Sequence, residues 1–568
     1  MGYDLRIAGG TIVDGTGAPG YQGDVGIADG KIVALGDAPD TAARTIDATD
    51  RIVAPGFVDI HTHYDAQIIW DRMLTISPWH GVTTVVMGNC GFGVAPTRPD
   101  HRDMIIETFE RVEGMNKAAL WAGLGDDWPF ETFPEYLDAI EQRGTALNVA
   151  AMIGHTPVRL YVMGEESTER SATPEEVAEM QAIVGEAIEA GGIGFSTSQS
   201  PVHVGYQGRP VPSRLADFDE IRALCQPLGE AGEGLIAINV GRRPWFDEYA
   251  QLTRETGRPL SWTALLAGQL GPGTYRKTLD RAGQQAAEGL AIYPQVSCRP
   301  LIVEFSFAEP SSMIRLPFFL PVAQVDVAGR RKLYADPAFR KVLKDGFAAM
   351  EHEPGEMTAR WHSWQATVIS RCDEEPALEG RKVADIARER GVDAMDLALD
   401  LSLASDFSAR FRMPLSNFDE TEVADLLRDP NTLLGLSDAG AHTDQLCDAC
   451  YSTHLLGHWV RENGTLGLEQ AVRMLTSRPA DIYNIADRGR LKVGLPADVT
   501  VFDPETVGAG KLRRVRDYPA GQERVVADAS GIDAVVVNGV MIRDGDHDAL
   551  PADGEMPGKL LRHGRAAT

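Results

Sequence analysis

Cysteine, basic residues and long apolar runs are all scarce in this chain of 568 residues. It has six cysteines and no basic segment followed by an apolar one at the N-terminus, which predicts reduced thiols rather than a disulfide framework. No run approaches the roughly 18 to 20 apolar residues of a membrane span. We therefore expect a cytoplasmic protein without disulfide bonds or membrane-crossing segments.

Positive charge is outnumbered, because 54 Lys and Arg residues against 82 Asp and Glu residues give a formal net charge of -28. The negative electrostatic field of such a protein would repel nucleic acids and anionic membrane surfaces, which argues against both as partners. The apolar fraction of 43% and the charged fraction of 24% are those of an ordinary soluble globular protein. A small molecule is the expected partner, and the sequence leaves a homo-oligomer open.

Short alternating runs predict β-structure at both ends of the chain. From Tyr3 to Gly36, apolar and polar residues alternate between glycine-rich turns, as in antiparallel strands. Similar runs occur at 498–502 and 532–542. Because chain ends often lie close together, we expect residues 1–56 and 486–568 to form one composite β-sandwich domain.

The central part of the chain predicts an α/β fold with parallel strands. Short apolar strands separated by long connections indicate a parallel sheet, and eight of them indicate a (β/α)8 TIM-like barrel, here residues 57–485, with its chemistry at the C-terminal strand ends. A long insertion at about 296–431 precedes the last strand and is typical of a lid or substrate-binding segment. The expected strands are Phe57–His61, Thr83–Gly88, Leu147–Gly154, Gly192–Thr197, Leu235–Val240, Leu260–Leu265, Leu290–Gln295 and Leu433–Asp438.

Two histidines at the end of the first expected strand are the strongest sign of chemistry. Side chains two positions apart on a strand point to the same face, so His61 and His63 can bind one metal ion. Asp438 ends the last expected strand, where its carboxylate could bind the same ion. It could instead cap a following helix. Cys90 follows the second strand, and a lone buried cysteine is commonly inert. The histidine pair in this context predicts a metallohydrolase.

Several motifs occur in an order that resembles one enzyme family over nearly the whole chain. The motifs are Ala54-Pro55-Gly56-Phe57-Val58-Asp59-Ile60-His61-Thr62-His63, Gly88-Asn89-Cys90-Gly91, Gly154-His155, Pro212-Ser213-Arg214, Ser437-Asp438-Ala439-Gly440-Ala441-His442 and Gly494-Leu495-Pro496-Ala497-Asp498. In this order they resemble the amidohydrolase superfamily, and within it the D-aminoacylase, or N-acyl-D-amino-acid deacylase, branch of the amidohydrolase family 3 type.

The resemblance implies a barrel flanked by a β-sandwich, with a divalent metal, usually zinc, at the barrel mouth. It implies His61, His63, Cys90 and Asp438 as metal ligands and Asp438 as general base. Zinc accepts imidazole, thiolate and carboxylate ligands and lowers the pKa of a bound water to about 7, so that hydroxide can attack a carbonyl. The expected function is hydrolysis of a non-peptide C–N bond, as in N-acyl amino acid deacylases, with Asp438 passing the proton to the leaving nitrogen.

The chain departs from the branch at the fifth and sixth strands, where D-aminoacylases carry metal-binding histidines. These strands hold Asn239 and Thr263 instead, and no lysine that could bridge two metals occurs between Lys117 and Lys277. We favour a site with one zinc ion, which still satisfies the pattern of three protein ligands and a water. The alternatives are a non-catalytic ligand-binding homologue or a replacement ligand drawn from His155, His203 and His442.

The substrate is the least defined part of this hypothesis. An N-acyl amino acid carries a carboxylate, which an arginine at the pocket rim would bind. A cyclic amide hydrolase or a deaminase is the alternative activity, since both need the same hydroxide. The candidate arginines are Arg159, Arg299, Arg410 and Arg412.

Overall fold

The computed structural model describes residues 2–39, 41–241, 245–269, 271–308, 310, 313, 316–350, 364–551 and 554–566. The chain divides into two compact units. The larger comprises residues 1–265, 279–298 and 427–568, and the smaller comprises residues 266–278 and 299–426. Both contain helices and strands, which confirms the predicted α/β class. No described helix is long and apolar enough to cross a membrane.

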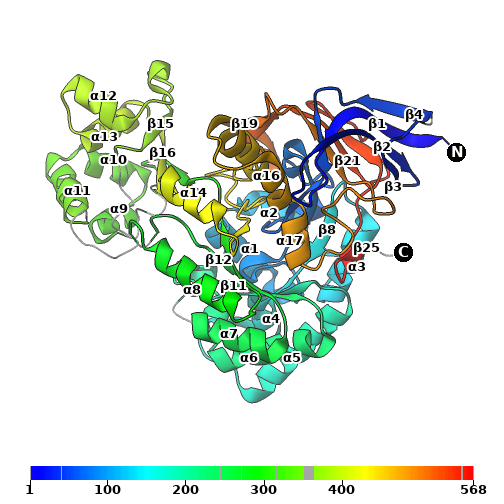
Figure 1. Ribbon diagram of the computed structural model, residues 1–568. Helices are drawn as coiled ribbons and strands as arrows, with labels where there is room; N and C mark the ends of the chain where they lie inside the picture. The colour runs from blue at the N-terminus through cyan, green and yellow to red at the C-terminus, as the bar shows by residue number, and fades with distance from the viewer. Residues whose placement is uncertain are drawn as a thin grey trace. The chain divides into compact units, whose positions relative to one another are not determined.

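One nine-stranded sheet of the larger unit contains both ends of the chain. Its strands are β1 (Tyr3–Ile12), β2 (Tyr21–Ala28), β3 (Lys31–Gly36), β4 (Ala42–Asp47), β5 (Ile52–Pro55), β18 (Val499–Phe502), β21 (Ile532–Val537), β22 (Val540–Asp544) and β23 (His547–Asp548). Their order is β23-β22-β21-β18-β5-β1-β2-β3, with β4 beside β1. The N- and C-terminal segments meet where β5 pairs antiparallel with β18, and Figure 1 shows β1, β2 and β21 close together.

Alternating burial explains why the two terminal segments associate. Along β1, Leu5, Ile7 and Ile12 are buried, and they share one apolar cluster with Val499 and Val501 of β18. Period-two patterning puts Leu5 and Ile7 on one face of the sheet, and an irregularity in the pairing between Ile7 and Gly10 shifts the register, so that Ile12 is buried as well. Removing this face from water stabilises the pairing of segments that lie hundreds of residues apart in sequence.

Parallel strands follow one another in the order of the chain. They are β6 (Phe57–Asp59), β7 (Val82–Met87), β8 (Asn148–Ala151), β9 (Ile153–Gly154), β10 (Gly194–Ser198), β11 (Leu235–Asn239), β12 (Leu260–Thr263), β13 (Ile292–Val296) and β17 (Leu433–Leu434). The first three form one sheet, and the other six form a second sheet in the order β17-β13-β12-β11-β10-β9. Thr62, just after β6, makes an isolated parallel bridge with Ala439, just after β17. The first and last strands of the series are therefore linked.

The last strand is shorter than the sequence predicts. Strand pairing of β17 stops after Leu434, whereas the expected strand continued to Asp438. Leu436 and Asp438 have positive φ angles of 63° and 45°, which extended backbone does not allow. The chain therefore turns before it reaches the aspartate.

Helices connect the parallel strands. They are α1 (Arg102–Val112), α2 (Lys117–Leu124), α3 (Phe133–Arg143), α4 (His155–Met163), α5 (Pro174–Glu189), α6 (Phe218–Ala231), α7 (Phe246–Thr256), α8 (Tyr275–Ala287), α15 (Tyr451–His454), α16 (Leu468–Leu475) and α17 (Ser477–Ile482). All belong to the larger unit except the start of α8, residues 275–278, which belongs to the smaller one. Helices α5, α6 and α7 lie side by side (Figure 1). A capping box of Thr173 and Glu176 starts α5, satisfying backbone donors that have no partner within the helix. The remaining strands are β19 (Gly508–Tyr518), β20 (Gln522–Ser530), β24 (Leu561–Arg562) and β25 (Arg565–Ala566).

The smaller unit has its own aromatic core. Phe305 stacks on Phe411 with ring centroids 5.6 Å apart, and Phe307 lies edge-on to Tyr334 at 5.3 Å. Its second segment, 299–426, falls within the insertion expected at about 296–431. Its elements are β14 (Leu301–Phe305), β15 (Val368–Arg371), β16 (Arg410–Ser416), α9 (Leu320–Ala323), α10 (Val327–Ala335), α11 (Pro337–Met350), α12 (Val383–Arg390), α13 (Ala394–Ala404) and α14 (Glu420–Arg428).

A buried ion pair joins the parallel strands to the nine-stranded sheet. Arg488 Nε lies 2.6 Å from Asp498 Oδ2, which also accepts a hydrogen bond from Asn148 of β8 at 2.7 Å. Replacing Arg488 with methionine should lower the free energy of unfolding by about 3 to 5 kcal/mol, because the carboxylate would remain buried without a counter-charge. Denaturant unfolding of the full chain measures this loss.

Arg490 provides the matched control, since its pair with Asp481 is partly exposed at 2.6 Å. An exposed pair contributes only about 0 to 1 kcal/mol, so Arg490→Met should change unfolding little. Equal losses for Arg488→Met and Arg490→Met would contradict the structural role of the buried pair.

Candidate functional site

His61 and His63 lie just beyond β6 rather than on it. The intervening Thr62 keeps the backbone extended, because its N–H donates to Val86 O at 3.2 Å and it bridges Ala439. Both histidine side chains are buried, and their ring centroids are 5.4 Å apart. The two rings therefore converge as the sequence spacing predicts.

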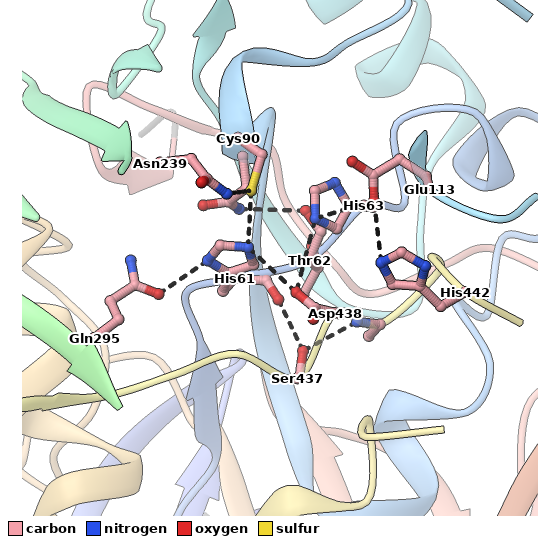
Figure 2. A network of polar contacts seen from close by, with 12 residues as sticks. His61, Thr62, His63, Cys90, Glu113, Asn239, Gln295, Ser437, Asp438 and His442 are labelled. Atoms are coloured by element: carbon pink, nitrogen blue, oxygen red, sulfur yellow. Dashed lines mark hydrogen bonds and ion pairs between the residues drawn. The ribbon is translucent and has the colours of Figure 1, made fainter. Parts of the chain in front are cut away.

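Asp438 approaches both histidines. Its Oδ1 lies 3.3 Å from His61 Nε2 and 3.8 Å from His63 Nε2 (Figure 2). The neighbouring Ser437 fixes this turn, because its hydroxyl donates to His61 O at 2.9 Å. Burial raises the pKa of Asp438 to about 6, with His442 lowering it and Asp448 raising it.

Cys90 completes the predicted group. It follows β7 in the turn Asn89–Gly91 with a φ of 55°. Its Sγ is 3.4 Å from His61 Nε2, and ligand atoms of Cys90, His61 and His63 all lie within 4.8 Å of one another. Asn239 Nδ2 donates to Cys90 Sγ at 3.3 Å. Burial, together with the charges of Glu113 and Asp438, raises the pKa of the Cys90 thiol.

Gln295, the last but one residue of β13, orients the His61 ring. Its Nε2 donates to Ser261 Oγ at 2.9 Å and to Tyr483 OH at 3.1 Å, so its Oε1 is left to accept from His61 Nδ1 at 2.9 Å. These contacts assign the proton of the His61 ring to Nδ1. The lone pair of Nε2 therefore points toward Asp438 and Cys90. Burial lowers the pKa of His61 to about 4, so the imidazole is neutral at pH 7 and able to bind a cation.

The three candidate replacement ligands have different surroundings. His155 contacts Thr197 Oγ1 through Nδ1 at 2.8 Å and Glu220 Oε1 through Nε2 at 2.9 Å, so neither nitrogen is available as a ligand. His203 Nδ1 contacts Ser198 Oγ at 2.8 Å. His442 turns its Nε2 toward the carboxylate of Glu113.

Arg159 is not placed to bind a substrate carboxylate. It is fully buried and its Nη1 is 2.5 Å from Glu220 Oε2, so its charge is already neutralised inside the protein. Arg299, Arg410 and Arg412 belong to the smaller unit, where Arg412 Nε pairs with Glu304 at 2.7 Å.

Glu113 is an acidic neighbour of the histidines that the sequence did not suggest. It lies at the C-terminal end of α1 and is only 3% exposed. Its Oε2 is 3.6 Å from His63 Nε2 and 3.8 Å from His442 Nε2. A single glutamate before a glycine belongs to no recognisable sequence motif, so its position beside the histidines is seen only in the folded chain.

These donors have the chemistry of a transition-metal site. The group offers two neutral imidazoles, a thiol and carboxylates in buried positions, and zinc accepts all three ligand types. The ends of β11 and β12 carry Asn239 and Thr263, which add no imidazole. The residues present therefore fit a divalent cation.

Comparisons with known proteins agree with this chemistry. A model described as the amidohydrolase family matches residues 44–295 and 336–543. D-aminoacylase of Alcaligenes xylosoxydans xylosoxydans is 31% identical over 551 residues, covering 95% of this chain and 94% of the relative. N-acyl-D-glutamate deacylase of the same organism is 30% identical over 569 residues, covering 98% and 96%.

Solved structures agree as well. N-acyl-D-glutamate deacylase from Bordetella bronchiseptica, complexed with zinc and a phosphonate inhibitor, matches with a TM-score of 0.65 and 28% identity over 99% of this chain and 100% of that chain. A D-aminoacylase described by the role of its binuclear metal centre matches with a TM-score of 0.64 and 27% identity over 98% and 99%. The predicted resemblance to the D-aminoacylase branch is confirmed, and the chain belongs to the amidohydrolase family.

Proposed function

We propose that this amidohydrolase is a metal-dependent deacylase that hydrolyses the amide bond of N-acylated amino acids. The observation that carries the proposal is the convergence of His61 Nε2 and His63 Nε2 on Asp438 Oδ1, at 3.3 and 3.8 Å. The relatives with the same overall fold are described as D-aminoacylases and N-acyl-D-amino-acid deacylases.

The scaffold of this proposal is a (β/α)8 barrel over residues 57–485, beside a composite β-domain of residues 1–56 and 486–568. The barrel is supported by the chain order of the parallel strands and by the bridge between Thr62 and Ala439. The composite domain is supported by the sheet that the two terminal segments share.

The proposed cation is one zinc ion, held by His61, His63, Asp438 and Cys90. Zinc is supported by the donor types and by the zinc complex of the Bordetella deacylase. A single ion is supported by Asn239, which donates to Cys90 Sγ at 3.3 Å from a strand end where the branch has a metal-binding histidine. Thr263, at the end of the next strand, provides no imidazole ligand either.

In the proposed reaction a water adds across the amide bond and gives a carboxylate and an amine. A bound divalent cation polarises the carbonyl and lowers the pKa of a water. Asp438 accepts the proton of the attacking water and delivers it to the leaving nitrogen. Gln295 keeps His61 in the orientation that faces Asp438. Atoms balance, because one water proton is transferred to the nitrogen, the oxygen enters the carboxyl group, and the second water proton is released from that group to the amine or to solvent.

The test is a product analysis with a panel of N-acetyl-D-amino acids, their L-enantiomers, a hydantoin and an aminopyrimidine. We expect an N-acetyl-D-amino acid to give acetate and a free amine, measured by mass spectrometry, with His61→Ala as the inactive control. Ammonia release would instead indicate a deaminase, and opening of the hydantoin alone would indicate a cyclic amide hydrolase. No turnover of any compound by zinc-loaded enzyme would contradict the proposal.

A further inference from the structure

Glu113 is a buried acid that the proposed ligand set does not use. It is 3% exposed, and in the described part of the chain no lysine or arginine pairs with its carboxylate and no hydrogen bond reaches it. Buried carboxylates are normally paired with a cation, hydrogen-bonded or bound to a metal. The environment of Glu113 therefore lacks a positive charge.

The two histidines beside Glu113 do not hydrogen-bond its carboxylate. The Nε2 atoms of His63 and His442 lie 3.6 and 3.8 Å from Glu113 Oε2, which is longer than a hydrogen bond. The gap between the donor atoms is wide enough for an ion that they share.

The spacing of the donor atoms matches that of ligands around one ion. Donor atoms that share one zinc ion at the usual ligand distances lie roughly 3 to 4 Å from one another. The pair of His63 Nε2 and Glu113 Oε2 is separated by 3.6 Å. The pairs that Asp438 Oδ1 makes with His61 Nε2 and His63 Nε2 measure 3.3 and 3.8 Å. Figure 2 shows the Glu113 carboxylate directed at the same imidazole that Asp438 faces.

We propose that Glu113 is a further ligand of the cation held by His61, His63 and Asp438, and that His442 positions its carboxylate. This inference rests on the proposed function. The backbone N–H of His442 donates to Glu113 O, and Gly114 permits the close approach, since a Cβ there would lie 3.3 Å from His442 Cα. With Glu113 added, the proposed ligand set has two imidazoles, two carboxylates and the Cys90 thiol, donor types that suit zinc and other first-row divalent metals.

The experiment measures the zinc affinity of the full chain by competition with a chromophoric chelator, without reference to activity. Glu113→Gln, which keeps the size but removes the charge, should weaken zinc binding at least ~10- to 100-fold. Glu113→Asp, which keeps the charge but shortens the reach, should also weaken it. His442→Ala should give a smaller loss, because His442 acts only through Glu113.

Glu110→Gln is the matched control, since it removes the same charge from the same helix and should leave the affinity unchanged. Circular dichroism checks that each variant is folded. If Glu113→Gln and Glu113→Asp both bind zinc as tightly as the wild type while His61→Ala does not, Glu113 is not a ligand and the proposed function stands. If His61→Ala also binds as tightly as the wild type, the proposed site itself fails.

Discussion

Asp438→Asn should abolish most of the turnover while the zinc remains bound. Asparagine retains an oxygen that can contact the cation but cannot accept a proton, and general base catalysis contributes about 100- to 10,000-fold to such reactions. We therefore expect kcat to fall by this factor for the best N-acyl amino acid, with a near-normal metal content. Steady-state kinetics and elemental analysis of the same preparation measure both quantities.

Asp448→Asn is the control for Asp438→Asn. Asp448 lies near enough to raise the pKa of Asp438, but it is not among the groups proposed to contact the water or the cation. Its replacement should leave kcat within a few-fold of the wild type. Full activity of Asp438→Asn would show that another group is the base.

His61→Ala should lose the cation. His61 Nε2 lies 3.3 Å from Asp438 Oδ1 and 3.4 Å from Cys90 Sγ, and Gln295 contacts the other ring nitrogen at 2.9 Å, so alanine removes a preorganised ligand from the centre of the group. We expect zinc to be lost on dialysis and kcat to fall to background. Metal analysis before and after dialysis measures the first effect.

His458→Ala removes a histidine elsewhere in the larger unit, one whose Nδ1 lies 3.3 Å from Glu462. It should retain wild-type zinc content and activity. Retention of zinc by His61→Ala would mean that the cation is bound somewhere other than at this histidine pair.

The central residues of the site could be predicted because their signals are local. His61 and His63 are two positions apart after an apolar strand, and Cys90 and Asp438 stand in short motifs at the ends of expected strands. The folded chain brings all four together. Their roles as ligands and base are still predictions that the variants test.

Glu113 and Gln295 depend on tertiary structure instead. Glu113 ends an ordinary helix, and only the packing of that helix end against the loop of His442 carries it to His63. Gln295 acquires its orienting role from contacts with Ser261 and Tyr483, which lie on other elements. Sequence spacing carries no information about such contacts.

For the fold, the sequence predicted the positions of the strands but not the exact end of the last one. Apolar runs and turn residues predicted where the strands lie, but the strand that was expected to reach Asp438 ends at Leu434. The cause is the left-handed backbone at Leu436 and Asp438, a conformation that is uncommon for residues other than glycine, although aspartate adopts it more readily than leucine. Such a conformation is imposed by surrounding contacts, here the hydrogen bonds of Ser437 and Ala439 with the histidine segment.

Zinc content per chain, measured by elemental analysis on protein purified without chelator or added metal, shows whether the histidine pair holds a metal ion. We expect about one equivalent in the wild type and near none in His61→Ala, because a preformed ligand set binds its ion tightly. No zinc in the wild type, even after zinc is offered, would contradict the claim that this amidohydrolase works through a metal held at His61, His63 and Asp438.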